Sequence, residues 1–335
     1  MFGASAPLAK RLLGHTAPQL LAGLLYGGAA IVLSVAMACR RHNPEARLRR
    51  EDLPKVGVVT LTGGVLAPVL LLVGLDRVTG VAGSLLLNLE AVLTMALALF
   101  LFGEHLSRRA FAGAAAVVLA STVLGLGGGG SRVDAVGIVA IAAACALWAI
   151  DNNVTQRLSG RDPFAIVRAK AAVAGSVNLA LAAALGAVGP SVLVIFAACA
   201  LGGAAYGLSI VLDAYALRWA GAAREAAYFA SAPLFGVLTA VVVLDERVTA
   251  AEGLAMVVMA AGIFLLVTER HEHRHVHAPV EHDHRHRHDD GHHDHVHEPP
   301  VEAHAHPHVH VGMAHAHPHV SDAHHRHGHD DRGGA

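Results

Sequence analysis

Three kinds of residue are scarce in this 335-residue chain. Aromatic residues make up 4% of it, charged residues 15%, and there are three cysteines. A soluble domain of this length would carry more charge and show amphipathic periodicity, so the composition argues against that class. Cys39, Cys145 and Cys199 all lie in apolar runs without a pairing pattern, which indicates small buried side chains rather than a disulfide framework.

The apolar part of the chain also lacks the motifs that mark common enzymes. It contains no phosphate-binding loop, no nucleophile motif and no HExxH-type zinc site. We therefore expect that the protein is not an enzyme and that it requires no cofactor.

Apolar residues are abundant. The chain is 54% hydrophobic with a mean hydropathy of +0.49, and its apolar runs are repeatedly about 20 residues long. That length crosses the hydrocarbon core of a bilayer as a helix. The composition changes sharply near Glu269, and the tail beyond it holds 23 of the 26 histidines. The sequence predicts an all-α polytopic membrane protein with a histidine-rich C-terminal tail.

The apolar body predicts nine clear membrane spans and one short first helix. The clear spans are 17–39, 55–75, 79–102, 108–127, 134–155, 163–187, 190–212, 222–244 and 249–268. The segment MFGASAPLAKRLL at the start is too short to span a membrane but looks like the second half of a helix. We expect that the front of this first helix is missing, and with it the count is ten.

Lysine and arginine are distributed unevenly between the two sets of predicted loops. With the N-terminus inside, the inside loops hold fourteen of these residues, whereas the outside loops hold three, Arg77, Arg132 and Arg247. Cytoplasmic loops carry the excess of positive charge. The distribution predicts ten spans in the cell (inner or plasma) membrane with both ends, including the tail, in the cytoplasm.

Two segments half the body apart look alike. SLLLNLEAVLTMALALFLFGEHLS (84–107) and AYFASAPLFGVLTAVVVLDERVT (227–249) are each an apolar helix ending in a short acidic turn. Aligning Glu104 with Glu246 gives a separation of 142 residues, an interval that holds five helices. Because an odd number of helices turns the second copy upside down, the sequence predicts two inverted five-helix repeats with a binding cavity near the midplane.

These two segments resemble the signature segments of the EamA family, within the drug/metabolite transporter (DMT) superfamily. WAIDNNVTQRLS (148–159) resembles the start of that family's second half, and APLAKRLL (6–13) the end of its first helix. The resemblance implies a first repeat over 1–127 with a truncated first helix, a second repeat over 134–268, and a tail over 269–335. It also implies a secondary transporter of metabolites, without specifying the substrate.

Asn88 and Glu90 are polar residues well inside the apolar run 85–104. A carboxylate at a helix centre costs about 2.5–3.5 kcal/mol on insertion scales, so such residues usually face a bundle interior or a water-filled cavity. We expect Glu90 to couple protons or substrate and Asn88 to line the cavity. The alternative is a packing carboxylate that holds two helices together.

A second polar group is the run Asp151, Asn152 and Asn153, which covers nearly a whole helical turn, so at least one of its side chains faces inward. The run either lines the cavity or caps a helix end at the membrane interface.

Lys170 and Asn178 lie two turns apart on roughly one face of the next helix. Lys170 can pair with Asp151 or Glu90 across the cavity, or extend back to the cytoplasmic surface. Asp213 and Tyr228 are interpreted as interfacial or packing residues.

The tail repeats the pattern His-x-His, and in an extended chain residues i and i+2 point the same way. Neutral imidazole binds zinc, nickel, cobalt and copper, so we expect redundant divalent-metal ligands along the tail. Proline, glycine and charge predict that it is disordered. The alternative is a low-complexity extension with incidental affinity. The candidate ligands are His271, His273, His275, His277, His282, His284, His286, His288, His304, His306, His308 and His310.

Three functions remain open at this point. The first is a proton-coupled secondary transporter of a small organic solute, and the second is a divalent metal-ion (Ni/Co/Zn) transporter whose tail binds or senses the cation. The third is a membrane-anchored metal store or sensor that does not transport. The expected partners are a small-molecule substrate, membrane lipid, divalent metal ions and, for a homodimer, a second copy of the chain; no nucleic-acid partner is expected.

Overall fold

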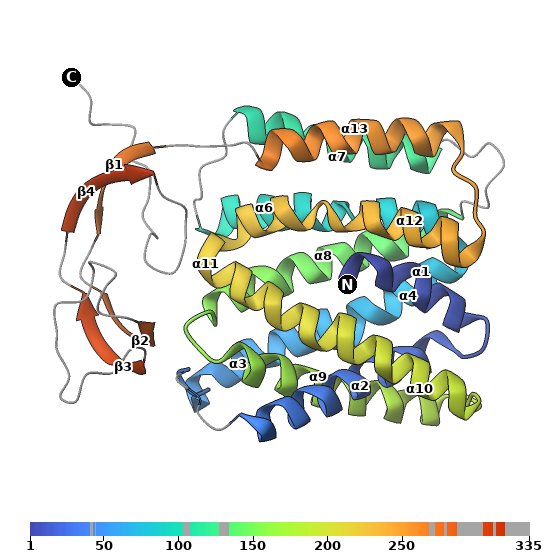
Figure 1. Cartoon of the computed structure of the whole chain (residues 1–335), viewed down its shortest axis with the longest axis horizontal. Coiled ribbons are helices and arrows are strands. Elements are labelled where there is room, and N and C mark those ends of the chain that lie inside the picture. The colour runs from blue at the N-terminus through green and yellow to red at the C-terminus, as the bar shows by residue number, and fades with distance from the viewer. Residues whose placement is uncertain are drawn as a thin grey trace.

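The computed structural model describes residues 1–40, 43, 45–102, 108–126 and 134–267 of the body, and 272–277, 280–286, 304–310 and 313–318 of the tail. The body is a bundle of helices stacked in layers, with α7 and α13 on one outer side and α2, α9 and α10 on the other (Figure 1). The predicted acidic turn at 103–107 lies outside the described residues.

The first half of the bundle contains one short 3₁₀ helix, one π-helical segment and seven α-helices among the described residues. They are α1 (Phe2–Leu13), α2 (Pro18–Cys39), η1 (Arg50–Asp52, 3₁₀), α3 (Leu53–Val59), η2 (Thr60–Leu66, π), α4 (Ala67–Arg77), α5 (Gly80–Leu86), α6 (Leu89–Phe102) and α7 (Arg108–Leu126).

The second half, as far as it is described, contains six α-helices and one further π-helical segment. They are α8 (Ala135–Arg157), α9 (Pro163–Ala184), α10 (Val192–Leu201), η3 (Gly202–Leu208, π), α11 (Ser209–Phe229), α12 (Ala232–Leu244) and α13 (Ala250–Val267).

Six helical stretches are long and apolar enough to cross a membrane. They are Pro18–Cys39, Arg50–Arg77, Gly80–Phe100, Ala135–Arg157, Pro163–Ala184 and Val192–Trp219. Shorter apolar helices cover Phe111–Ala120, Ala232–Leu244 and Ala250–Leu265. Large apolar side chains point outward from these helices, with Phe100 and Val242 each 82% exposed. A surface of this kind suits lipid rather than water, so the body is that of a polytopic membrane protein.

Several helices begin where the sequence supplies a cap. Thr79 accepts a hydrogen bond from the Ala82 amide at 3.1 Å, and Asp162 accepts one from the Phe164 amide at 3.0 Å. Asp134 accepts from the Val136 amide at 2.8 Å and pairs with Arg77, and these two contacts lower the pKa of its exposed carboxyl. Side-chain oxygens thus satisfy amides that a helix start leaves without partners.

One predicted loop is helical. The sequence suggested separate spans at 190–212 and 222–244, but α11 continues through Ser209–Phe229, and the helix breaks at Ala230 and Ser231 instead. The stretch AYALRWAGAAREAA (214–227) is rich in alanine and lacks proline, so its helix propensity carries the helix through the expected loop. Asp213 and Glu225 are therefore on one helix.

The two halves correspond along the chain at a constant offset. The π-helical segments η2 and η3 begin at Thr60 and Gly202, which are 142 residues apart, and each contains 7 residues. The packing is matched as well: α7 lies against α13 and α2 against α9, while α1 packs on α12 as α8 packs on α6. The spacing of η2 and η3 equals that of the two acidic turns in the sequence.

Glycines allow the closest helix crossings. A Cβ atom added at Gly28 of α2 would overlap the backbone of Cys199, and one added at Gly202 of η3 would overlap the backbone of Leu25. Small residues at such crossings let helix backbones approach each other in a membrane, where packing rather than water drives association.

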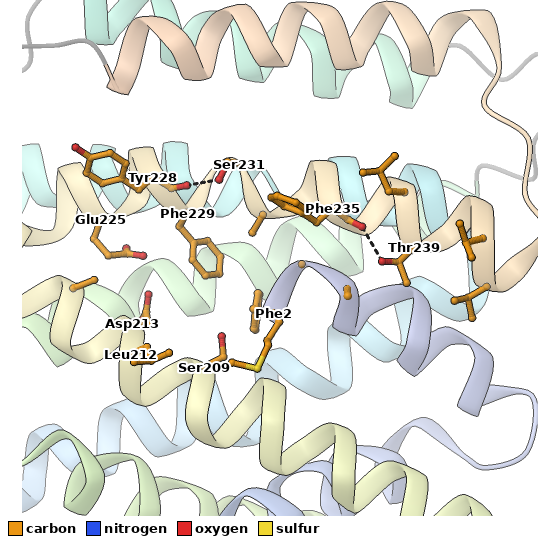
Figure 2. Close-up of a pocket in the computed structure, with 18 residues that line it drawn as sticks. Phe2, Ser209, Leu212, Asp213, Glu225, Tyr228, Phe229, Ser231, Phe235 and Thr239 are labelled. Atoms are coloured by element: carbon orange, nitrogen blue, oxygen red, sulfur yellow. Dashed lines mark hydrogen bonds between the residues drawn. The ribbon is translucent and has the colours of Figure 1, made fainter.

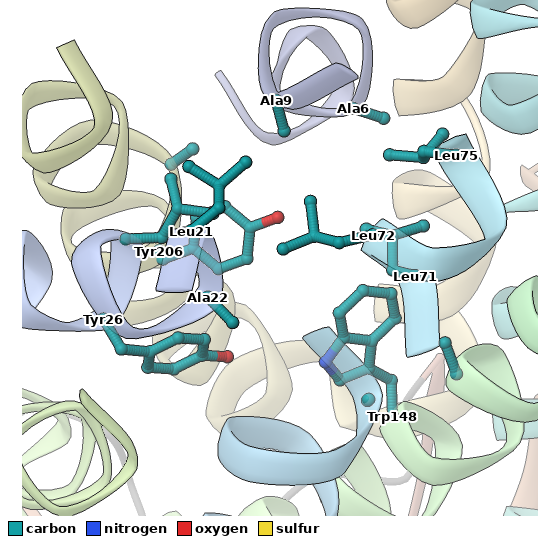
Figure 3. Packing of buried hydrophobic residues seen from close by; sticks show 14 of the residues in the cluster. Ala6, Ala9, Leu21, Ala22, Tyr26, Leu71, Leu72, Leu75, Trp148 and Tyr206 are labelled. Carbon is teal, nitrogen blue, oxygen red and sulfur yellow. The ribbon is translucent and has the colours of Figure 1, made fainter. Parts of the chain in front are cut away.

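Aromatic side chains fix the first π-helical segment. The Tyr26 hydroxyl donates to the Gly63 carbonyl at 2.6 Å, and the Trp148 indole nitrogen donates to the same oxygen at 3.1 Å. Both side chains are buried in the main apolar core beside Leu71 and Leu72 (Figure 3). A π-helical turn exposes backbone carbonyls that the α-helical pattern would occupy, and these two donors satisfy one of them.

Polar contacts close both ends of the bundle. At the end where α2, α8 and α13 terminate (Figure 1), Arg218 binds Glu45 at 2.9 Å and Arg161 binds Asp52 at 2.9 Å. At the opposite end the Glu246 carboxylate accepts hydrogen bonds at 2.8 Å from both the Gly80 and Val81 amides, which start α5. The connections are therefore tied to helices of the other half at each end.

The tail forms four short strands where the sequence predicted disorder. β1 (Glu272–His277) pairs antiparallel with β4 (Met313–Pro318), and β2 (Val280–His286) with β3 (His304–His310), beside the bundle in Figure 1. The period-two His-x-His pattern is compatible with a strand, which the compositional argument did not weigh. Two-stranded ladders are marginally stable in water, so these add little to the stability of the fold.

Candidate functional site

Glu90 and Asn152 meet between α6 and α8. The Asn152 side-chain amide donates to Glu90 Oε1 at 3.0 Å and approaches the Thr94 hydroxyl at 3.4 Å. Glu90 is 5% exposed, and its second oxygen, Oε2, has no hydrogen-bond partner among the described residues. A buried carboxyl with one unpartnered oxygen is costly as an anion, so this position is suited to hold a proton or to receive a ligand.

Asp151 and Lys170 form a buried ion pair between α8 and α9. The Lys170 ammonium binds Asp151 Oδ2, and the Thr155 hydroxyl donates to Asp151 Oδ1 at 3.3 Å. Lys170 is 3% exposed, so it does not extend to the surface. The pair lies against η2, where a Cβ added at Gly63 would overlap the Asp151 carboxylate.

Asn153 and Asn178 bind backbone. Asn153 donates to the carbonyls of Thr94 and Ala149, at 3.1 and 2.8 Å, and so joins α8 to α6. Asn178 donates to the Gly64 carbonyl at 3.2 Å and accepts from Gln19 at 2.8 Å. Both amides hold helices together, and Asn178 supports the second exposed carbonyl of η2.

Asn88 lies apart from the other candidates. It sits at the break between α5 and α6, and its side-chain amide contacts Met259 Sδ of α13 at 3.3 Å. Its Oδ1 atom is buried without a partner among the described residues. The structure thus gathers Glu90, Asn152 and Asn153 around one contact and places Asn88 elsewhere.

A cavity of about 820 Å³ lies between α11 and α12, with the start of α1 against it (Figure 2). This volume is in the range of small-molecule sites. Its walls are mostly apolar and aromatic, with Phe2, Phe229 and Phe235 among them. Its polar groups include Ser209 and the carboxyls of Asp213 and Glu225.

Asp213 and Glu225 form a carboxyl pair that the sequence interpretation missed. Their side chains point toward each other, and both line the cavity (Figure 2). Glu225 is buried at 4% exposure, while Asp213 is half-buried. Residues 12 positions apart on a straight α-helix lie about 18 Å apart, so helical periodicity gave no signal for this pair.

The carboxyl pair and the Glu90 group both place acidic side chains inside the apolar bundle. The Glu90 group includes Asp151 and Lys170, and Asp213 and Glu225 line the cavity. Among the described residues, the two groups together hold four carboxyls and the one ammonium of Lys170. Protons or a bound cation would relieve such an imbalance in an apolar bundle.

The predicted metal ligands are less well defined. The register places His282, His284 and His286 opposite His308, His306 and His304. In the other ladder, His273 and His275 lie opposite His317 and His315, and His277 lies opposite Met313. His310 lies opposite Val280, while His271 and His288 are outside the described residues. Among the side chains that the structure describes, no group of three histidine, cysteine or acidic residues could hold a metal ion, and the metal-transport alternative has no support there.

Matches to known proteins cover both halves of the body. The sequence model of a family described as EamA-like transporters matches residues 1–126 and 135–268. A protein of Methanothermobacter thermautotrophicus named an uncharacterized transporter is 30% identical over 283 residues, covering 79% of this chain and 82% of its own.

A solved crystal structure, described only as that of a protein, has a similar fold. It superposes with a TM-score of 0.63 at 20% identity, and the match covers 80% of this chain and 93% of that one. At this identity the likeness concerns the fold alone.

Proposed function

Since the chain belongs to the EamA-like transporter family, in the DMT superfamily, we propose that it is a proton-coupled secondary transporter of a small organic solute. The solute binds in the cavity between α11 and α12, within a body of ten membrane spans. The observation that carries this proposal is Glu90: it is buried in the first turn of α6, beside the helix break at 87–88, with one carboxyl oxygen unpartnered among the described residues.

Two inverted five-helix repeats account for the internal correspondence of the body. The equal offset of η2 and η3, and the paired packing of α1 on α12 and α8 on α6, support this arrangement. In such transporters the substrate site lies at the interface of the repeats, and the two halves rock around it. Glu90 and Asp213 come from different halves of the chain, as a site shared between the repeats requires.

The orientation follows from charge. We propose that the end joined by the Arg218–Glu45 and Arg161–Asp52 pairs is cytoplasmic, because the arginine-rich connections lie there. α13 ends on the same side (Figure 1), so the histidine-rich tail would also be cytoplasmic, at the plasma membrane. The histidines that lie opposite one another in the two ladders would bind divalent metal ions. Transport by the body would not require that metal.

Proton coupling is tested with Glu90→Gln, which keeps the shape and the Asn152 contact but cannot exchange a proton. Purified protein in liposomes with a pH-sensitive dye inside is given a proton gradient and fractions of a cell metabolite extract. We expect wild type to show solute-dependent proton flux and Glu90→Gln to lose it by at least tenfold.

The matched control is Glu51→Gln, which alters a carboxyl with 63% of its side chain exposed and should leave flux unchanged. Undiminished solute-driven proton flux in a well-folded Glu90→Gln protein would refute the assignment.

A further inference from the structure

We propose that the connection between α2 and α3 is a binding surface for anionic phospholipid. In this surface Arg47, Arg50 and Lys55 bind the headgroup phosphates, and the apolar start of α3 lies against the acyl chains. The surface is at the end of the bundle where α3 begins (Figure 1). It is separate from the cavity and from the Glu90 group, so the inference goes beyond the proposed transport and does not depend on it.

The charged side chains of this connection are sorted by sign. Glu45 is buried, and its carboxylate binds Arg218 of α11 at 2.9 Å. Asp52 is buried as well, and Arg161 binds it at 2.9 Å. The neighbouring Glu51 is exposed but accepts a hydrogen bond from Arg161 at 3.0 Å. The acidic side chains are therefore bound within the protein, and positive charge is left facing outward.

Three basic side chains of the connection are exposed, namely Arg47, Arg50 and Lys55. None of the three forms an ion pair with another residue that the structure describes. Basic side chains gathered beside a membrane helix attract anionic lipid headgroups. The outward charge of this connection therefore matches the charge of such a lipid.

The backbone beneath these side chains is held in place. The Ala46 carbonyl accepts a hydrogen bond from the Asp162 amide at 2.9 Å, which ties the connection to the start of α9. The Arg49 amide donates to Asp52 Oδ2 at 2.9 Å and so fixes the start of η1. A surface that is already ordered loses less conformational entropy when a ligand binds to it.

The same segment continues directly into a lipid-facing helix, which favours a lipid over a soluble anion. Leu53, Val58 and Leu61 are exposed apolar side chains on α3 and at the start of η2. Lys55 and Val58 are three residues apart, so they share a face of α3 and are separated by about 4.5 Å along its axis. Lys55 can therefore pack its stem on acyl chains while its ammonium group stays at the level of the headgroups.

The strength of the preference follows from the number of charges. Each basic residue close to an anionic membrane surface strengthens binding about fivefold, so three should together strengthen it by up to about a hundredfold. Because exposed charges are screened beyond about 10 Å at 0.1 M ionic strength, and at shorter range in more concentrated salt, most of the preference should be lost at high salt.

The test uses the full-length protein in detergent at about pH 8, where unperturbed histidines of the tail are neutral. Native mass spectrometry counts bound lipid during titration with dioleoyl phosphatidylglycerol or dioleoyl phosphatidylcholine, which share acyl chains and differ in headgroup charge. We expect wild type to bind phosphatidylglycerol at least tenfold more tightly. An equal concentration of inorganic phosphate should not displace the lipid, because free phosphate lacks the apolar contact; displacement would indicate a phosphate site and overturn the inference.

The triple variant Arg47→Gln/Arg50→Gln/Lys55→Gln should bind phosphatidylglycerol about ten- to hundredfold more weakly than wild type does and lose the preference. Arg47→Lys/Arg50→Lys/Lys55→Arg keeps the three charges and should keep the preference. Arg247→Gln, which removes an exposed charge at the opposite end, should match wild type. A monodisperse elution profile in size-exclusion chromatography establishes that each variant is folded.

Two outcomes would overturn the lipid surface: wild type that binds both lipids equally, or a folded triple variant that keeps the preference. Neither outcome bears on the proton flux of Glu90→Gln, which tests transport separately.

Discussion

Lys170→Met removes the cation of the buried ion pair and leaves Asp151 without its ammonium partner. Both side chains are almost fully enclosed, with 4% and 6% of their surfaces exposed, so water cannot replace the lost contact. Asp151 keeps the Thr155 hydroxyl at 3.3 Å, a single weak donor for a carboxylate. Removing one partner of a buried pair costs about 3–5 kcal/mol, and we expect the free energy of unfolding to fall by that amount.

The double variant Lys170→Met/Asp151→Asn separates electrostatics from packing. It removes both charges and retains the shape of the Asp151 side chain beside Gly63, where added volume would overlap. We expect it to recover at least half of the stability lost in Lys170→Met, because an unpaired amide is less costly than an unpaired carboxylate. The measurement is SDS titration of protein in mixed micelles, followed by far-UV circular dichroism.

Arg168→Met is the matched control. Arg168 is two residues away on α9 and exposed, so its loss should change stability by less than about 0.5 kcal/mol. If Lys170→Met is no less stable than Arg168→Met, or if the double variant is less stable than Lys170→Met, the buried pair does not contribute as argued.

Two further predictions concern the end contacts and the tail. Glu246→Ala removes the carboxylate that accepts hydrogen bonds from the Gly80 and Val81 amides, and should lower the free energy of unfolding by about 1–2 kcal/mol. The control Arg247→Ala changes an exposed side chain and should not lower it. Equal stability of the two variants would contradict the capping role. Truncation after residue 270 should abolish extra accumulation of nickel, cobalt, zinc or copper in cells while leaving solute-driven proton flux intact; metal accumulation that persists without the tail would place the cation in the membrane pathway.

Hydropathy was sufficient to find the helices, because a span needs about 20 apolar residues and the chain has few other apolar stretches. It could not show where those helices break. The helix breaks at 87–88 and 230–231 lie inside largely apolar runs, as do the two π-helical segments. The composition is similar on both sides of each. Their positions depend on partners such as Tyr26 and Trp148, which only packing brings to Gly63.

The candidate site was predictable in part. Glu90 and Asp151 stand out because a carboxyl in an apolar run has few explanations. Glu225 does not stand out in this way. The loop predicted at 213–221 placed it near the start of a span, where acidic residues are common. Asn178 was chosen by helical periodicity relative to Lys170, and it does lie inward, but its contacts are with the Gly64 carbonyl and Gln19.

The π-helical segments restrict how the chain can change in length. An α-helix turns by about 100° per residue, so the extra residue of a π-turn rotates everything before it relative to everything after it. Deleting one residue from η2 would restore a regular helix but swing α3 around α4 by roughly a quarter turn or more, carrying Thr60 to another face. Related sequences should therefore carry no insertion or deletion within η2 or η3, even where the side chains at these positions differ.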